Sequence, residues 1–226
     1  MRSVVRAALL LGAALVLSAC ASGGSRLTSA RAAADTTAIP TTTVATPTKR
    51  SYIGPNGLPI ETGPFLAAAT TTALGGIVHG IQCEPMAQLA YASYAHLQVY
   101  VDGRSRALPG GIGLVDQQPQ LTPAGIFYSA GTCMYWLHTR AADGLIEAQS
   151  PVRRHFTLGD FFAIWRQPLS GRQVAGATGR VTATVNGRRW TGDPREIPLR
   201  EHADIELAVG RPAPRPRPVN WQATSF

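Results

Sequence analysis

The sequence lacks the motifs on which many common enzyme families depend. Its 226 residues include three cysteines and a single lysine, Lys49. It contains no Gly-x-Ser-x-Gly, no His-Glu-x-x-His and no glycine-rich phosphate loop, and the one lysine cannot complete a Ser-x-x-Lys pair. These absences argue against the usual serine hydrolase, zinc protease, penicillin-binding and nucleotide-binding motifs.

Long apolar runs are also missing, and the one short run lies near the amino terminus. Residues 7–16 are apolar throughout and follow Arg2 and Arg6. A helix that crosses a bilayer needs about 20 apolar residues, so this run is too short to be a stable span. A basic start followed by a short apolar core is typical of a signal peptide. We therefore predict that residues 1–19 direct export and are then removed.

The apolar run ends in Leu17-Ser18-Ala19-Cys20, which resembles the lipobox of bacterial lipoproteins. In that motif the cysteine receives diacylglycerol before cleavage, so the resemblance implies a lipid on Cys20. The alternative is an ordinary signal peptide with a chance cysteine at its end. Acyl chains contribute about 0.8 kcal/mol per buried methylene, which predicts a durable membrane anchor facing the periplasm or the exterior. The sequence does not choose between an inner and an outer membrane.

Negative charge is scarce relative to positive charge. The chain has 21 basic and 13 acidic residues, a net charge of +8, and 19 basic residues remain once Arg2 and Arg6 are removed. A basic exported protein can contact anionic lipid headgroups, acidic wall polymers or another envelope protein. Nucleic acid is not expected as a partner, because an exported protein does not meet it.

Apart from Cys20, only Cys83 and Cys133 remain, an even pair in an oxidising compartment. A disulfide would close a loop of about 50 residues and stabilise the fold by about 4 kcal/mol. A metal site is the alternative, because His79 and His138 lie near the two cysteines in sequence.

Composition divides the chain into four parts. After the signal peptide, residues 20–62 are mostly small and polar and predict a flexible tether. Residues 63–210 form one domain's length of chain, and residues 211–226 begin with alternating arginine and proline that predict an extended tail.

The domain shows mainly strand patterns. Residues 96–101 and 181–185 alternate and are followed by the turns Asp102-Gly103 and Asn186-Gly187, and residues 205–209 alternate as a last strand. Thr157 is a good N-cap for a helix that Pro168 ends, and Pro85 to Tyr91 is a second candidate helix. We predict a mainly β fold: a single small antiparallel sandwich or barrel-like domain with one or two short helices.

Polar side chains gather in residues 133–149. Two strands around a tight Asp143-Gly144 turn would place Arg140 opposite Glu147 and His138 opposite Gln149. Side chains alternate along a strand, so these four would share one face. We interpret that face as exposed, with a cross-strand ion pair worth less than about 1 kcal/mol.

The segments 133–140 (Cys-Met-Tyr-Trp-Leu-His-Thr-Arg) and 156–165 (Phe-Thr-Leu-Gly-Asp-Phe-Phe-Ala-Ile-Trp) resemble a group of uncharacterised exported bacterial domains. The resemblance covers most of residues 77–209. It implies histidines in relatives at the positions of Ala92, Tyr94, Arg140 and Glu147, beside His96 and His138, and hence transition-metal binding. Here that set is mostly replaced, so we predict no cofactor, with a residual copper or zinc site at His79, His96 and His138 as the alternative.

The favoured function from sequence is a non-catalytic binding or structural module of the envelope. The main enzymatic alternative is a cysteine-dependent wall enzyme. Residues 129–133 (Ser-Ala-Gly-Thr-Cys) faintly resemble the Ser-x-Gly-Cys of peptidoglycan transpeptidases, with His79 or His138 as the base for Cys133. No catalytic residue is assigned.

Overall fold

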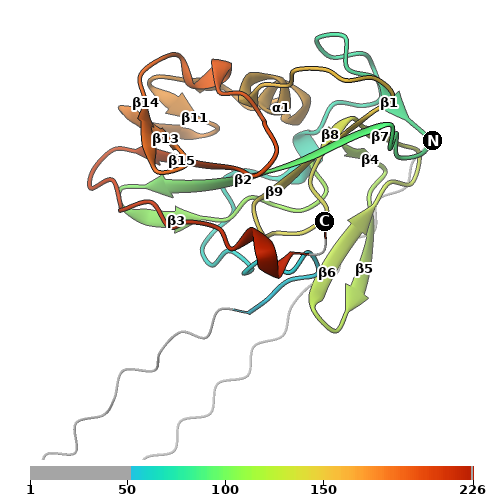
Figure 1. Ribbon diagram of the computed structural model, residues 1–226, viewed down its shortest axis with the longest axis horizontal. Coiled ribbons are helices and arrows are strands. Elements are labelled where there is room, and N and C mark those ends of the chain that lie inside the picture. Colours follow the sequence, from blue (N-terminus) through green and yellow to red (C-terminus); the bar gives the residue numbers. More distant parts are fainter. Residues whose placement is uncertain (1–51, 225) are drawn as a thin grey trace, which may run out of the picture. The chain divides into compact units, whose positions relative to one another are not determined.

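The computed structural model describes residues 52–224 and 226, which belong to one compact unit, Thr48–Phe226 (Figure 1). The predicted signal peptide, the lipidation site Cys20 and residues 20–51 of the predicted tether lie outside the described residues. No described helix is long and apolar enough to cross a membrane.

The unit is mainly β, as predicted, and its largest sheet has seven strands. Its order is β14-β13-β15-β2-β9-β8, with β3 paired to the far part of β2. The strands of this sheet are β2 (Tyr91–Val101), β3 (Arg104–Arg106), β8 (Leu137–His138), β9 (Leu145–Ser150), β13 (Val181–Val185), β14 (Arg188–Trp190) and β15 (Ala203–Val209). All pairs are antiparallel except β15 with β2, and the described sheets do not close into a barrel.

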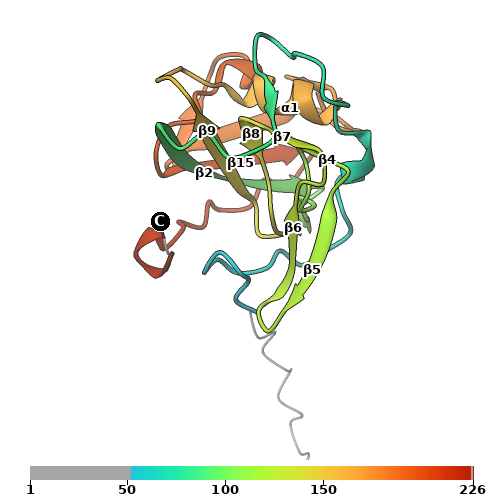
Figure 2. The same cartoon turned by 90° about the vertical axis from the view of Figure 1, so that its right-hand side faces the viewer.

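Smaller sheets surround this one. One has the order β1-β7-β4, another β10-β11-β12, and β5 pairs with β6 as a separate hairpin. Their bounds are β1 (Cys83–Glu84), β4 (Leu114–Val115), β5 (Gln118–Thr122), β6 (Gly125–Ser129), β7 (Cys133–Tyr135), β10 (Leu169–Ser170), β11 (Gln173–Val174) and β12 (Ala177–Thr178). Figure 2 shows the β5–β6 hairpin extending away from the large sheet.

The predicted tight turns at Asp102-Gly103 and Asn186-Gly187 are confirmed. Asp102 and Gly103 have φ of 49° and 75°, and Asn186 and Gly187 have φ of 50° and 72°. Two successive left-handed residues make the turn whose twist matches paired strands, and Asn, Asp and Gly adopt it at least cost. These turns connect β2 to β3 and β13 to β14.

The predicted helix is confirmed as α1 (Leu158–Trp165). The Thr157 hydroxyl accepts a hydrogen bond from the Asp160 amide at 3.2 Å, and the Asp160 carboxylate accepts one from the Thr157 amide at 3.0 Å. This reciprocal capping begins the helix at Leu158. Three short 3-10 turns, η1 (Ala69–Thr71), η2 (Pro194–Glu196) and η3 (Trp221–Ala223), complete the helical structure of the described residues.

The second candidate helix, Pro85 to Tyr91, is wrong. Tyr91 begins β2, and residues 85–90 form bends and a turn between β1 and β2. A helix needs an apolar face to bury, but Met86 and Leu89 are 74% and 68% exposed.

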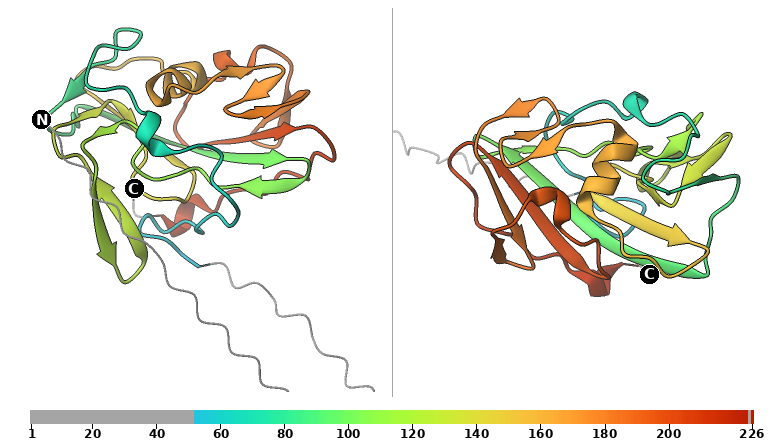
Figure 3. Two further views of the ribbon diagram at one scale, coloured as in Figure 1. Left: turned by 180° about the vertical axis from the view of Figure 1, so that it is seen from behind. Right: turned by 90° about the horizontal axis from the view of Figure 1, so that it is seen from above.

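The large sheet has two different faces (Figures 1 and 3). One face packs under α1 and forms the apolar core, which includes Leu97, Ile205, Phe161 and Trp165. The other face carries polar side chains, among them His96, Glu147, Gln149, Asp204 and Glu206, which are nevertheless buried or nearly so.

Segments outside the predicted domain boundaries of 63 and 210 cover this polar face. Leu58 is 2% exposed, and the Glu61 amide donates to the Ala142 carbonyl at 3.0 Å. From the carboxyl end, the Val219 amide donates to Asp204 Oδ2 at 3.3 Å. The described residues before 63 and after 210 therefore pack as part of the folded unit.

Candidate functional site

The polar hairpin predicted around Asp143-Gly144 exists with a different register. His138 pairs with Glu147, and Leu137 pairs with Ala148, so residues 139–144 form a wide connection instead of a two-residue turn. The predicted pairs His138–Gln149 and Arg140–Glu147 are therefore wrong as strand partners. Because the register differs by two residues, His138, Glu147 and Gln149 still lie on one face, as predicted.

Three side chains converge on one carboxylate oxygen, Glu147 Oε2. Gln149 Nε2 donates to it at 3.0 Å, Arg140 Nε lies 3.4 Å away, and His138 Nε2 also lies 3.4 Å away. His138 Nδ1 contacts the Tyr135 carbonyl at 2.9 Å. The predicted exposed face is therefore wrong: His138 is fully buried, and Glu147 and Gln149 are 6% and 7% exposed.

The environment of Glu147 favours its ionised form. Burial by itself raises the pKa of this carboxyl, but the hydrogen bond and charge of His138, together with Arg140, hold the pKa below its ordinary value. The guanidinium of Arg140 also lies 5.5 Å from the centre of the Phe127 ring. The cluster thus pairs the Glu147 carboxylate with nearby positive charge and connects β8, β9 and β6, although His138 Nε2 and Gln149 Oε1 have no hydrogen-bond partner among the described residues.

Positions that the resemblance assigns to histidine in relatives do lie together. Tyr94 pairs with Glu147 and Ala92 with Gln149 across β2 and β9. Tyr94 is covered by Phe226, whose ring stacks on it at 4.3 Å. In this chain Ala92, Tyr94, Arg140 and Glu147 present a methyl group, a phenol, a guanidinium and a carboxylate, so only His138 presents an imidazole beside them.

His96 lies elsewhere on the same face and has its own partners. Its Nδ1 lies 3.4 Å from Asp204 Oδ1 on the parallel neighbour β15. A side chain on Gly144 would meet the imidazole, because a Cβ built there lies 2.7 Å from His96 Nε2. The left-handed glycine therefore lets the 139–144 connection close over this histidine.

Two carboxyl groups near His96 have a raised pKa because they are buried. Burial raises the pKa of Glu61 to about 7, opposed by the charge of His96 and by the Leu108 amide that donates to Glu61 Oε2 at 2.7 Å. Burial likewise raises the pKa of Asp143 to about 6. These values mark a desolvated acidic layer between the sheet and the segment before residue 63.

His79 is far more exposed than the other two candidate ligands. Its side chain is 61% exposed, and its Nδ1 lies 3.0 Å from Asp160 Oδ1 at the start of α1. The Arg154 guanidinium donates to the His79 carbonyl at 2.6 Å and to the Gly80 carbonyl at 2.9 Å. This arrangement fixes the loop before β1 against the helix.

The three histidines predicted as a residual metal site are thus paired with three different carboxylates. Each pair lies on a different part of the fold: the start of α1, the β2–β15 pair and the β8–β9 pair. Within residues 52–224 and 226, no three His, Cys, Asp or Glu side chains are arranged to hold one metal ion.

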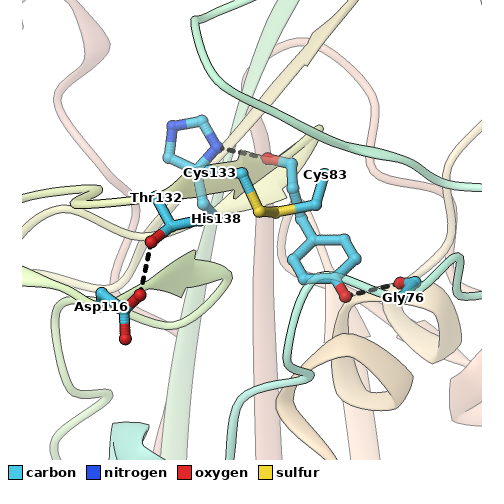
Figure 4. Close-up of a disulfide and its surroundings, with 7 residues drawn as sticks. Gly76, Cys83, Asp116, Thr132, Cys133 and His138 are labelled. Atoms are coloured by element: carbon cyan, nitrogen blue, oxygen red, sulfur yellow. Dashed lines mark hydrogen bonds between the residues drawn. A yellow bond between two sulfur atoms is a disulfide. The ribbon is translucent and has the colours of Figure 1, made fainter.

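The sulfurs of Cys83 and Cys133 lie at bonding distance, 2.00 Å, and join β1 to β7 (Figure 4). Nearby, the Tyr135 hydroxyl donates to the Gly76 carbonyl at 2.6 Å, and the Thr132 hydroxyl bonds to Asp116. A bonded Cys133 offers no thiolate, so this geometry gives no support to the cysteine nucleophile considered above.

An apolar groove that the sequence reasoning did not identify lies beside the β5–β6 hairpin. Its volume is about 410 Å³. The segment before residue 71, the 109–110 loop and the hairpin contribute its lining, which includes Tyr52, Ile60, Phe65, Ile126 and Tyr128.

Exposed apolar side chains continue from the groove over the hairpin. Leu121 is 88% exposed and pairs with Ile126, which is 48% exposed and lines the groove. Tyr52, Ile53 and Phe65 are each more than half exposed. We call Tyr52, Ile53, Phe65, Leu121 and Ile126 the hairpin patch. A sequence signal did exist: residues 117–137 contain no charged side chain and centre on Pro123-Ala124-Gly125.

Comparison of the chain with protein-family models, with curated proteins and with solved structures finds no match. The lipobox and the resemblance to exported bacterial domains therefore stay predictions from the sequence.

Proposed function

We propose that this protein is a lipid-anchored component of the bacterial cell envelope whose β-rich domain is a non-catalytic binding module. The anchor is proposed from the sequence, because residues 1–20 combine a basic start, a short apolar core and a lipobox-like cysteine. The binding role is supported by one structural observation: the hairpin patch and its groove expose clustered apolar side chains.

Unlike the side chains of the hairpin patch, the candidate reactive side chains have partners within the protein. His96, His138 and His79 each face a carboxylate, and Cys83 faces Cys133 at bonding distance. A general base must reach a substrate proton, and a nucleophile must be free to attack. These three histidines and two cysteines thus each have a partner within the fold, which favours a binding role over a catalytic one for them.

An apolar groove next to clustered apolar side chains is a typical binding surface. Single exposed apolar residues are ordinary, whereas contiguous ones mark interaction sites. The ligand class is therefore apolar, and the chain's positive charge favours one that carries or accompanies negative charge.

The anchor is tested by intact mass measurement of the native protein from membranes. A chain that begins at Cys20 and carries diacylglycerol and acyl mass supports the proposal, and Cys20→Ala should abolish both cleavage and lipid. A native chain that retains residues 1–19 and has no fatty acid would refute the anchor.

The groove is tested with a fluorescent apolar probe such as N-phenylnaphthylamine. Ala68 lines the groove and is exposed, so Ala68→Phe should fill it and lower probe affinity about tenfold. Ala90→Phe, at an exposed alanine between β1 and β2, is the matched control. Equal probe binding by the two variants would show that the groove is not the site.

A further inference from the structure

We propose that the hairpin patch docks on the surface of a lipid bilayer, with the tip of the β5–β6 hairpin inserted among the headgroups and upper acyl chains. This inference rests on the proposed function for the anchor that brings the domain to a membrane. The contact itself is a separate property of the folded unit.

The hairpin patch lies where the described chain begins. Tyr52 is the first described residue, and its hydroxyl donates to the Pro123 carbonyl in the hairpin turn at 2.5 Å. A Cβ on Gly125 would lie 3.8 Å from the Tyr52 ring. A chain anchored at Cys20 therefore enters the folded unit directly beside the hairpin tip, so among the described residues this end of the unit is the nearest to the anchor along the chain.

Inserting the hairpin tip into the bilayer interface removes no charged side chain from water. Residues 117–137 hold no charged side chain, and Leu121 near the tip is 88% exposed. Because Leu121 and Ile126 face each other across the two strands, both point to the groove side together. Tyr52 and Phe65 add aromatic rings, which favour the headgroup level.

The fold limits how deep the contact can be. The β5–β6 pair is a two-stranded sheet, so each strand has an edge whose amide and carbonyl groups lack a strand partner. Such groups need water, which the hydrocarbon core does not supply. The depth that fits is the interface, about 5–10 Å, reached by the turn and the Leu121–Ile126 pair alone.

Charge favours an anionic surface. Lys49 and Arg50 lie just before the patch in sequence, and residues 20–226 have 19 basic and 13 acidic residues, a net charge of +6. Basic residues near an anionic leaflet strengthen attachment and lose that effect in salt. A covalent anchor makes docking an intramolecular step, so even a weak surface affinity suffices in the anchored protein.

The test uses residues 20–226 with Cys20→Ser, so that no lipid is attached and the compact unit Thr48–Phe226 is intact. Binding is measured by flotation with vesicles of phosphatidylcholine and phosphatidylglycerol. Leu121→Asp is expected to weaken binding at least about tenfold. Met86→Asp is the matched control, because Met86 is 74% exposed, lies in the loop after β1 and is not part of the hairpin patch.

A second measurement does not depend on loss of binding. Leu121→Cys labelled with an environment-sensitive fluorophore should shift its emission to the blue on these vesicles, whereas labelled Met86→Cys should not. Absence of vesicle binding, equal loss in both aspartate variants, or equal shifts in both labelled variants would overturn the proposal. Because the tested chain has no acyl group, these results do not depend on whether the native protein is lipidated.

Discussion

Replacing Glu147 with alanine tests whether the buried charge cluster stabilises the domain. In the native protein one oxygen of Glu147 faces Gln149, Arg140 and His138 at 3.0–3.4 Å. Without it, a guanidinium that is 15% exposed and an imidazole that is fully buried lose their carboxylate. Removing one partner of a buried ion pair costs about 3–5 kcal/mol.

That loss is large compared with the stability of a typical domain, about 5–15 kcal/mol. The free energy of unfolding can be measured by guanidinium chloride titration, because Trp136 and Trp165 are buried and their fluorescence reports unfolding. Arg140→Ala should cost less than Glu147→Ala, since Glu147 then keeps His138 and Gln149. The double variant should cost less than the sum, with a coupling of about 0.5–3 kcal/mol.

Glu196→Ala is the matched control, because Glu196 is exposed on η2 and surface changes stay within about 0.5 kcal/mol. A cost below about 1 kcal/mol for Glu147→Ala would refute the reasoning, because it would mean that the cluster is solvated as a surface ion pair is. Because the pKa of Glu147 is lowered in the folded protein, its contribution to the free energy of unfolding should depend on pH. This contribution should be fully present above the ordinary pKa range of a carboxyl group and should be lost as pH falls through the folded-state pKa.

Three further changes have defined outcomes. Cys83→Ser with Cys133→Ser should cost about 4 kcal/mol in unfolding titrations, because the disulfide closes a 50-residue separation. Glu61→Gln should stabilise the protein by up to about 3 kcal/mol at pH 8 and little at pH 4. The reason is that a folded-state pKa of about 7, against 4.5 for the free group, makes wild-type stability fall as pH rises between those values. Phe226→Ala should lower stability by about 1 kcal/mol in thermal unfolding, because its ring stacks on Tyr94 at 4.3 Å.

Contrary results are equally specific. Reaction of Cys83 and Cys133 with a thiol reagent in denatured, unreduced protein would contradict the bond. A Glu61→Gln variant whose stability follows the wild-type pH profile would show that Glu61 is solvated. Unchanged melting of Phe226→Ala, with Leu121→Ala as an exposed apolar control, would mean that the end of the chain does not pack on Tyr94.

Several elements could be predicted because neighbouring residues decide them. The turns at Asp102-Gly103 and Asn186-Gly187 depend on residues that adopt a left-handed backbone at small cost. The start of α1 depends on Thr157 and Asp160, which bond to each other's backbone. In these places the interacting residues lie within three positions of each other, so a short stretch of sequence is enough to predict the interaction.

Other features could not be predicted because their partners are distant. The parallel pairing of β15 with β2 joins residues more than 100 positions apart. Gly144 passes close to His96, a residue of another strand, and nothing in residues 138–149 reveals this approach. The predicted helix at Pro85 to Tyr91 was wrong because helical residue preferences carried no information on whether its apolar side chains had a surface to cover.

By itself, the amino-acid sequence determined the mainly β character of the domain, the turns at Asp102-Gly103 and Asn186-Gly187, the capped helix and the pairing available to Cys83 and Cys133. Only the tertiary structure decided that described residues before 63 and after 210 cover the polar face of the large sheet, and that an uncharged hairpin is left exposed. The physical reason is that burial is a property of assembled surfaces: whether Glu147 or Leu121 meets water depends on residues far away in the chain.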